Sequence, residues 1–116
     1  MWVTSGPLTR AYVSPVFLPG AGPCLECLVN QFKRISPAPE IYQHLIAHAA
    51  GNNVIEPVII PDEATGLLEK LVVWKAGLLD APEAPAVLYQ LHALEIGTMT
   101  IEAHPVQIDP ECDACQ

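Results

Sequence analysis

The sequence has few positively charged residues. Five Lys and Arg stand against thirteen Asp and Glu, which gives a formal net charge of −8. Nucleic acids and anionic membrane surfaces are bound by clustered Lys and Arg, so this balance argues against both as partners. Polar residues also interrupt every apolar run well short of the length that crosses a bilayer. The first residues show neither the basic start nor the apolar stretch of a secretory signal, so we expect a cytoplasmic protein.

Sequence motifs of several common enzyme classes are absent as well. The 116 residues contain no glycine-rich phosphate loop, no nucleophilic serine elbow and no paired-histidine metalloprotease motif. We therefore expect no catalysis by this chain on its own. Hydrophobic residues make up 51% and charged residues only 16%, where a typical soluble domain has about 25% charged. Such a chain folds, as one domain over residues 1–116, and exposes apolar surface that a partner can cover.

Twelve prolines divide the chain into segments. An extended edge strand is expected over 12–18, because Pro15 excludes this segment from the centre of a sheet. Three segments with apolar residues at three- and four-residue spacing are predicted to be helices: 24–34, 39–51 and 62–79. Asp62 is expected to be the N-cap of the third helix. Residues 54–61 are expected to form an extended connection.

After Pro85 the apolar period changes from 3.6 to 2. Residues 88–96 and 99–104 are therefore predicted to form a β-hairpin across Gly97 and Thr98. Together these segments predict an α+β fold: about three helices, an N-terminal extended strand and a C-terminal β-hairpin.

The four cysteines form two pairs with the same spacing, Cys24 with Cys27 and Cys112 with Cys115, and 84 residues lie between the pairs. Two CxxC pairs are the usual means of placing four thiolates around one zinc ion. All four ligands would then come from the protein, so the predicted Zn²⁺ is structural and pins the helical segment. Each pair follows a proline closely, at Pro23 and Pro110.

Other interpretations of the cysteines stay open at this point. A redox-active CxxC at the start of a helix would use Cys24 as its reactive thiol, as in a thiol–disulfide oxidoreductase. Two structural disulfides would require an oxidising compartment. An iron–sulfur cluster also takes four thiolates.

The remaining polar candidates have simpler interpretations. His44 and His48 share one helix face, which is expected to be solvated rather than metal-binding. His92 and His104 are expected to point outward from the hairpin. Lys75 interrupts an apolar stripe and is expected to extend its amine to solvent. Five other residues are assigned to packing, helix ends or interfaces: Trp2, Lys33, Arg34, Trp74 and Leu79.

Three runs of sequence resemble one protein family. The run 14–28 (SPVFLPGAGPCLECL) resembles the first zinc knuckle of ThiF-like adenylating enzymes, in particular the cyclodehydratase components of thiazole/oxazole-modified peptide biosynthesis. The run 32–42 and the ending, 104–106 followed by 109–115 (DPECDAC), are similar to later parts of the same proteins. The resemblance covers nearly the whole chain but only the C-terminal part of a full-length ThiF-like protein.

The resemblance implies a structural zinc at Cys24, Cys27, Cys112 and Cys115. It also implies a non-catalytic scaffold in bacteriocin-type peptide biosynthesis, whose partners are a YcaO-type cyclodehydratase, which forms the azolines, and the precursor peptide. A fragment of a ThiF-like adenylating enzyme and a thiol–disulfide oxidoreductase are the alternatives. The apolar composition further predicts a homodimer that uses the strand at 13–18, the third helix or both.

Overall fold

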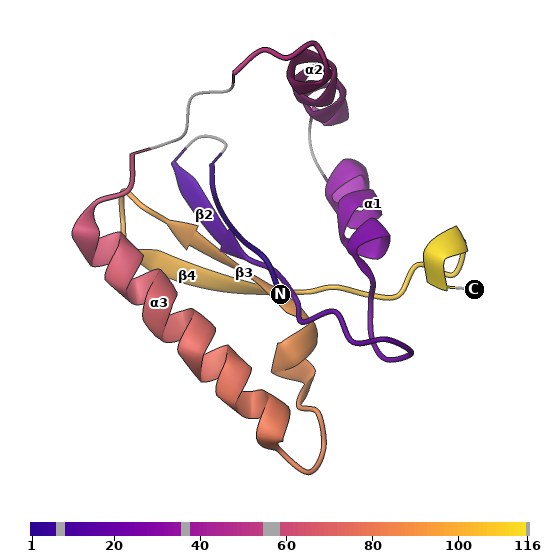
Figure 1. Cartoon of the computed structure of the whole chain (residues 1–116), viewed down its shortest axis with the longest axis vertical. Coiled ribbons are helices and arrows are strands. Elements are labelled where there is room, and N and C mark those ends of the chain that lie inside the picture. The colour runs from indigo at the N-terminus through magenta and orange to yellow at the C-terminus, as the bar shows by residue number, and fades with distance from the viewer. Residues whose placement is uncertain (7–8, 36–37, 55–58, 116) are drawn as a thin grey trace.

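The described part of the chain folds into three α-helices and one antiparallel sheet of four strands, which confirms the predicted α+β class. The computed structural model describes residues 1–6, 9–35, 38–54 and 59–115 (Figure 1). The helices are α1 (Leu25–Ile35), α2 (Pro39–Ala50) and α3 (Asp62–Gly77). The strands are β1 (Val3–Ser5), β2 (Arg10–Val13), β3 (Gln90–Glu95) and β4 (Thr100–Pro105). Short 3₁₀ helices are η1 (Leu78–Asp80), η2 (Ala86–Tyr89) and η3 (Asp113–Cys115).

The strands follow one another across the sheet in chain order, β1-β2-β3-β4. The predicted hairpin is present as β3 and β4, with Glu95 opposite Thr100 at the turn. The predicted edge strand is wrong in its position, because β2 lies between β1 and β3. Strand β2 ends at Val13, so Pro15 lies outside the ladder and does not prevent a central place.

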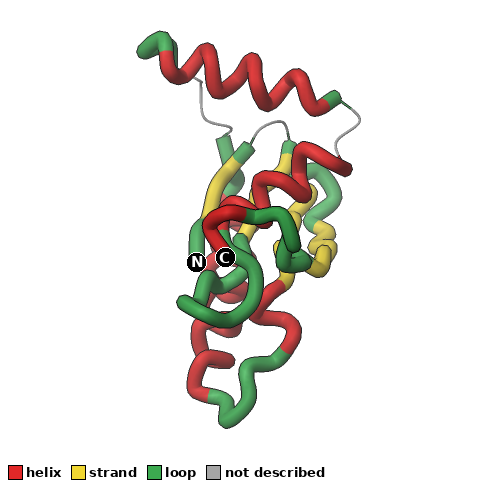
Figure 2. The backbone as a smooth tube through the Cα atoms, turned by 90° about the vertical axis from the view of Figure 1, so that its right-hand side faces the viewer, coloured by secondary structure: helices red, strands yellow, loops and turns green. Residues whose placement is uncertain are grey.

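Both faces of the sheet are covered by helices near its centre. Because neighbouring residues of a strand point to opposite faces, Ala11 and Val13 of β2 face one side and Tyr12 the other. On the first side Ala11 and Val13 pack with Leu94 of β3 and with Ala64 and Leu68 of α3. On the second side, where α1 lies, three residues form the other cluster: Leu28, Leu91 and Val106. In Figure 2, α2 is the helix at the top of the view, where it lies apart from the strands of the sheet.

Helix α2 has the predicted length but contributes little to the core. It has no buried residue, and Ile41 and Ile46 of its apolar stripe are 54% and 61% exposed. At the start of α3 the predicted cap is wrong: Pro61 occupies the N-cap position and Asp62 is the first helical residue, next to the dipole's positive end. Residues 55–58 of the expected extended connection lie outside the described residues.

A buried polar cluster joins α3 to the sheet, and it corrects two expectations. Lys75 is completely buried, and its amine donates hydrogen bonds to the main-chain oxygens of Ser14 (2.8 Å) and Gln90 (2.6 Å). The amine also lies 3.1 Å from Nδ1 of His92, which is buried as well. Lys75 does not reach solvent because three acceptors surround its ammonium group. His92 does not point outward because its side of β3 is the one that α3 covers.

None of the described helices combines the length and the apolar character that crossing a membrane requires.

Candidate metal centre

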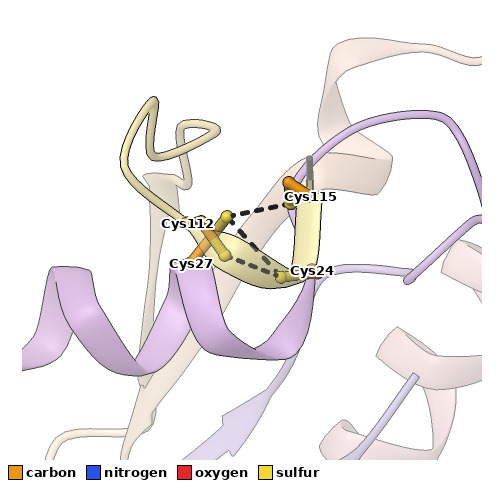
Figure 3. Close-up of side chains that lie close together, drawn as sticks. All are labelled: Cys24, Cys27, Cys112 and Cys115. Carbon is orange, nitrogen blue, oxygen red and sulfur yellow. Dashed lines mark hydrogen bonds between the residues drawn. The ribbon is translucent and has the colours of Figure 1, made fainter.

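The structure brings the four predicted ligands together, although 84 residues separate the two pairs. Cys24 immediately precedes α1 and Cys27 lies in the first turn of that helix. Cys112 and Cys115 lie before and at the end of η3, which folds back against the start of α1 (Figure 3). All four Sγ atoms lie within 4.8 Å of one another. The predicted set Cys24, Cys27, Cys112 and Cys115 is therefore confirmed as a cluster that could hold a metal ion.

The sulfur–sulfur distances identify the kind of site. Cys24 Sγ lies 3.7 Å from Cys27 Sγ and 3.5 Å from Cys112 Sγ, and Cys27 Sγ lies 3.4 Å from Cys115 Sγ. These distances are too long for disulfide bonds, whose S–S length is about 2.05 Å. A tetrahedral ion with metal–sulfur bonds of about 2.3 Å spaces its ligands about 3.8 Å apart. The four thiols thus have the spacing of ligands around one ion.

The electrostatics of the cluster favour different states for different thiols. A hydrogen bond from the backbone N–H of Cys27 lowers the pKa of the Cys24 thiol to about 7. Burial raises the pKa of Cys112 to about 12, and hydrogen bonding with Cys24 raises the pKa of Cys115. A cation among the sulfurs would lower the pKa values of Cys112 and Cys115, because a thiol that binds a metal must be deprotonated. The donor set therefore fits a metal that is bound with release of protons.

A buried carboxylate fixes the second cysteine pair against α1. Asp109 Oδ2 accepts hydrogen bonds from Arg34 (2.9 Å) and from Asn30 (3.2 Å) of α1. Its Oδ1 accepts the backbone N–H of Glu111 at 3.1 Å. The backbone N–H of Asp109 itself lies 3.4 Å from Cys27 Sγ and donates to it. Asp109 thus connects the helix, the loop before the second pair and one of the sulfurs.

A glutamine on α1 holds the chain that leads to this loop. The Gln31 side-chain amide donates to the main-chain oxygen of Pro105 at 2.9 Å and accepts the N–H of Gln107 at 3.2 Å. The segment after β4 is therefore held against α1 until the chain reaches Asp109. This explains how Cys112 and Cys115 reach the start of the helix.

The loop before Cys24 depends on glycine. Gly20 and Gly22 both have positive φ, at 75° and 71°, and Leu18 forms an isolated bridge with Ala21. A Cβ atom at Gly22 would overlap the ring of Tyr89, whereas one at Gly20 would meet no atom within 4 Å. Gly22 is thus needed both for its backbone angle and for close packing against η2.

This difference gives a matched pair of substitutions. We expect Gly22→Ala to lower the free energy of unfolding by roughly 2–5 kcal/mol, the sum of left-handed strain and overpacking. Gly20→Ala should cost only the strain, about 1–2 kcal/mol. Urea denaturation of both variants measures the difference. Equal losses in the two variants would contradict the proposed contact between Gly22 and Tyr89.

Asp109 gives a prediction about metal affinity. Residues that orient metal ligands typically change affinity by about 10–100-fold when they are replaced. If the cluster holds a metal ion, we expect Asp109→Asn to weaken its binding, measured with Zn²⁺, by that factor, because an amide cannot accept hydrogen bonds from Arg34 and Asn30 in the same way. Competition with a chromogenic chelator measures the affinity. Glu111→Gln is the control, since only the backbone of Glu111 contacts Asp109; equal losses for both variants would refute the role of the carboxylate.

The other sequence candidates lie away from this centre. His44 and His48 are exposed on α2, as expected. His104 is on β4, 3.4 Å from Glu102, and does not approach the sulfurs. Arg34 was assigned to a helix end, and its observed partner is Asp109. Sequence reasoning missed Asp109, Asn30 and Gln31; the available signal was an acidic residue immediately before the proline of the second pair.

Comparison of the chain with models of protein families, with curated proteins and with solved structures gives no match.

Proposed function

We propose that the four cysteines bind one structural Zn²⁺ and that the chain is a non-catalytic scaffold. The observation that supports this is the closed set of four protein thiols, which all lie within 4.8 Å of one another and include three sulfur–sulfur distances of 3.4–3.7 Å. With all four positions filled by the protein, such an ion has no site for water or substrate, and it stabilises the fold instead of reacting. A cluster of several irons binds its thiolates to separate ions and would require wider spacing of the sulfurs. A single zinc is therefore the preferred occupant.

We further propose that this scaffold belongs to a YcaO-type cyclodehydratase system of ribosomal peptide biosynthesis, in the cytoplasm. The support for this pathway is the sequence resemblance of residues 14–28, 32–42, 104–106 and 109–115 to ThiF-like components. In this proposal the chain would correspond to the C-terminal zinc-binding part of such a component and would bind the YcaO partner or the precursor peptide. The partner would form the azoline rings.

Two measurements test the metal and the pathway separately. Elemental analysis of protein purified under reducing conditions should give about one zinc per chain. Iron in place of zinc, or no metal, would refute the structural zinc. For the pathway, the genes beside this one should include a YcaO-type protein, and the chain should bind it in a pull-down with purified components. A neighbouring thioredoxin reductase gene with no YcaO gene would refute the pathway and leave the zinc result standing.

A thiol–disulfide oxidoreductase is the second candidate, and one observation favours it. Cys24 lies at the N-terminal end of α1, is partly exposed and has a thiol pKa lowered to about 7 by the N–H of Cys27. Reduction of insulin by metal-free protein, abolished in Cys24→Ser, would support this candidate. Inactive protein with a stoichiometric zinc would support the scaffold.

A further inference from the structure

Strand β1 has a free edge beside an apolar groove. The Ser14 N–H donates to Trp2 O at 2.8 Å and the Gly6 N–H donates to Arg10 O at 2.6 Å. Alternate residues of an antiparallel strand direct their main-chain N–H and C=O groups to the same side. The main-chain groups of Trp2, Thr4 and Gly6 therefore face β2. The N–H and C=O groups of Val3 and Ser5 therefore point away from the sheet. Among the described residues none pairs with this edge.

The groove lies on the α1 side of the same strand. It has a volume of about 300 Å³ and is bordered by Trp2, Thr4 and Gly6 on β1, by Tyr12 on β2, and by helices α1 and α2. The helices contribute Phe32, Tyr42 and Ile46, and Phe32 contacts both tyrosine rings. Trp2, which borders the groove, is 45% exposed, and Val3 on the opposite face of the strand is 45% exposed as well. This edge thus combines unpaired main-chain groups with a large exposed apolar surface.

We propose that a second copy of this chain pairs with β1 in antiparallel orientation and makes a continuous sheet across a two-fold axis. Pairing Thr4 with Thr4 of the second copy places Val3 opposite Ser5, the two residues whose main-chain groups face outward. Each such pair exchanges two hydrogen bonds, so the register satisfies the free edge. The inference does not depend on the proposed function.

The same register places an aromatic side chain opposite a glycine on the groove face. It places Trp2 of the second copy opposite Gly6, which has a φ of 83° and no side chain to fill the groove. The indole can therefore cover the aromatic rings beside Gly6, and symmetry repeats the contact. A two-fold interface must be self-complementary in this way.

Charge also favours a second copy at this edge. The chain has a net charge of −8, yet no acidic residue is present in β1 or in the described lining of the groove, where Lys33 is the one charged side chain. Two copies can therefore meet here with the least repulsion between their acidic surfaces. The opposite edge, β4, contains Glu102, His104 and Pro105, residues that discourage strand pairing.

The proposal is tested by the mass of the full chain in sedimentation velocity over a range of concentrations. We expect a dimer that Ser5→Pro, which removes an outward-facing N–H, weakens by roughly tenfold or more. Trp2→Ser should weaken it similarly, whereas Ile101→Ser, an exposed apolar residue of β4, should not. Far-UV circular dichroism verifies that each variant is folded.

Amide hydrogen exchange gives an independent measurement on the unmodified chain. The amides of Val3 and Ser5 should become protected as the concentration rises, while those at the free edge of β4 should not change. A monomer at every concentration would overturn the proposal. So would a dimer that survives both Ser5→Pro and Trp2→Ser, or one that Ile101→Ser disrupts equally.

Discussion

Removal of the proposed zinc by a strong chelator, under reducing conditions, is expected to lower the melting temperature of this protein strongly. Apparent binding free energies of four-ligand structural zinc sites are about 10–16 kcal/mol, as large as the whole stability of a typical domain. The apolar cores are small, since each cluster has only a few buried residues. The metal would therefore supply much of the free energy that holds α1 and the C-terminal segment together. Differential scanning calorimetry with and without chelator measures the effect.

Two single substitutions make this expectation sharper. Cys112→Ser should reproduce most of the effect of the chelator, because Cys112 is completely buried and its loss leaves an incomplete ligand set. Cys115→Ser should be milder, because Cys115 is exposed near the C-terminal end and water can replace its sulfur. Readdition of zinc should restore wild-type protein but not Cys112→Ser. An unchanged melting curve in chelator would refute a structural metal.

The features of the fold that follow from local pattern were predictable from the sequence. The helices at α1, α2 and α3 have continuous apolar spacing and clear proline or glycine limits, and the β3–β4 hairpin has a period of two. The cluster of four cysteines was predictable for a similar reason. The CxxC spacing fixes the geometry within each pair, and four thiols without a spare leave few ways to combine them.

The features that were missed depend on contacts between distant segments. Strand β1 has three residues, too few for a pattern, and it exists because β2 offers a partner. The role of Asp109 requires that α1 and the segment after β4 lie side by side. Lys75 interrupts an apolar stripe, and nothing local indicates that Ser14 and Gln90 supply acceptors for its amine. Tertiary context decides all three.

The buried cluster of Lys75 and His92 leads to the last prediction, a loss of stability in mild acid. Nδ1 of His92 accepts a hydrogen bond from the Lys75 ammonium group, so the imidazole is neutral in the folded protein. Burial, and then the charge of Lys75, lower the pKa of His92 from 6.5 to about 4. Protonation would place two cations in contact with no carboxylate among the cluster's hydrogen-bond partners.

The direction of the effect follows from the two pKa values. Between about pH 6.5 and pH 4 the unfolded chain binds a proton at His92 and the folded chain does not. The free energy of unfolding therefore decreases as the pH falls through this window, by roughly 3 kcal/mol in total. Lys75 has an effect of the same sign at alkaline pH, because burial lowers its pKa from 10.5 to about 8. Between these pH values the unfolded chain binds a proton at Lys75 that the folded chain has released, so the free energy of unfolding rises as the pH increases from about 8.

His92→Asn isolates this contribution, because the asparagine oxygen can accept from Lys75 near the position of Nδ1 but does not titrate. Acid also releases metal from thiolates, so wild type and variant must be compared at each pH. We expect urea denaturation to give a wild-type stability that falls by about 3 kcal/mol more than that of His92→Asn between neutral pH and pH 4.

Trp74, whose ring meets His92 edge-on at 6.1 Å, reports the same event by fluorescence in a Trp2→Phe background. His104→Asn on the exposed strand β4 is the control, and parallel acid losses in wild type and His92→Asn would show that His92 is not the group responsible.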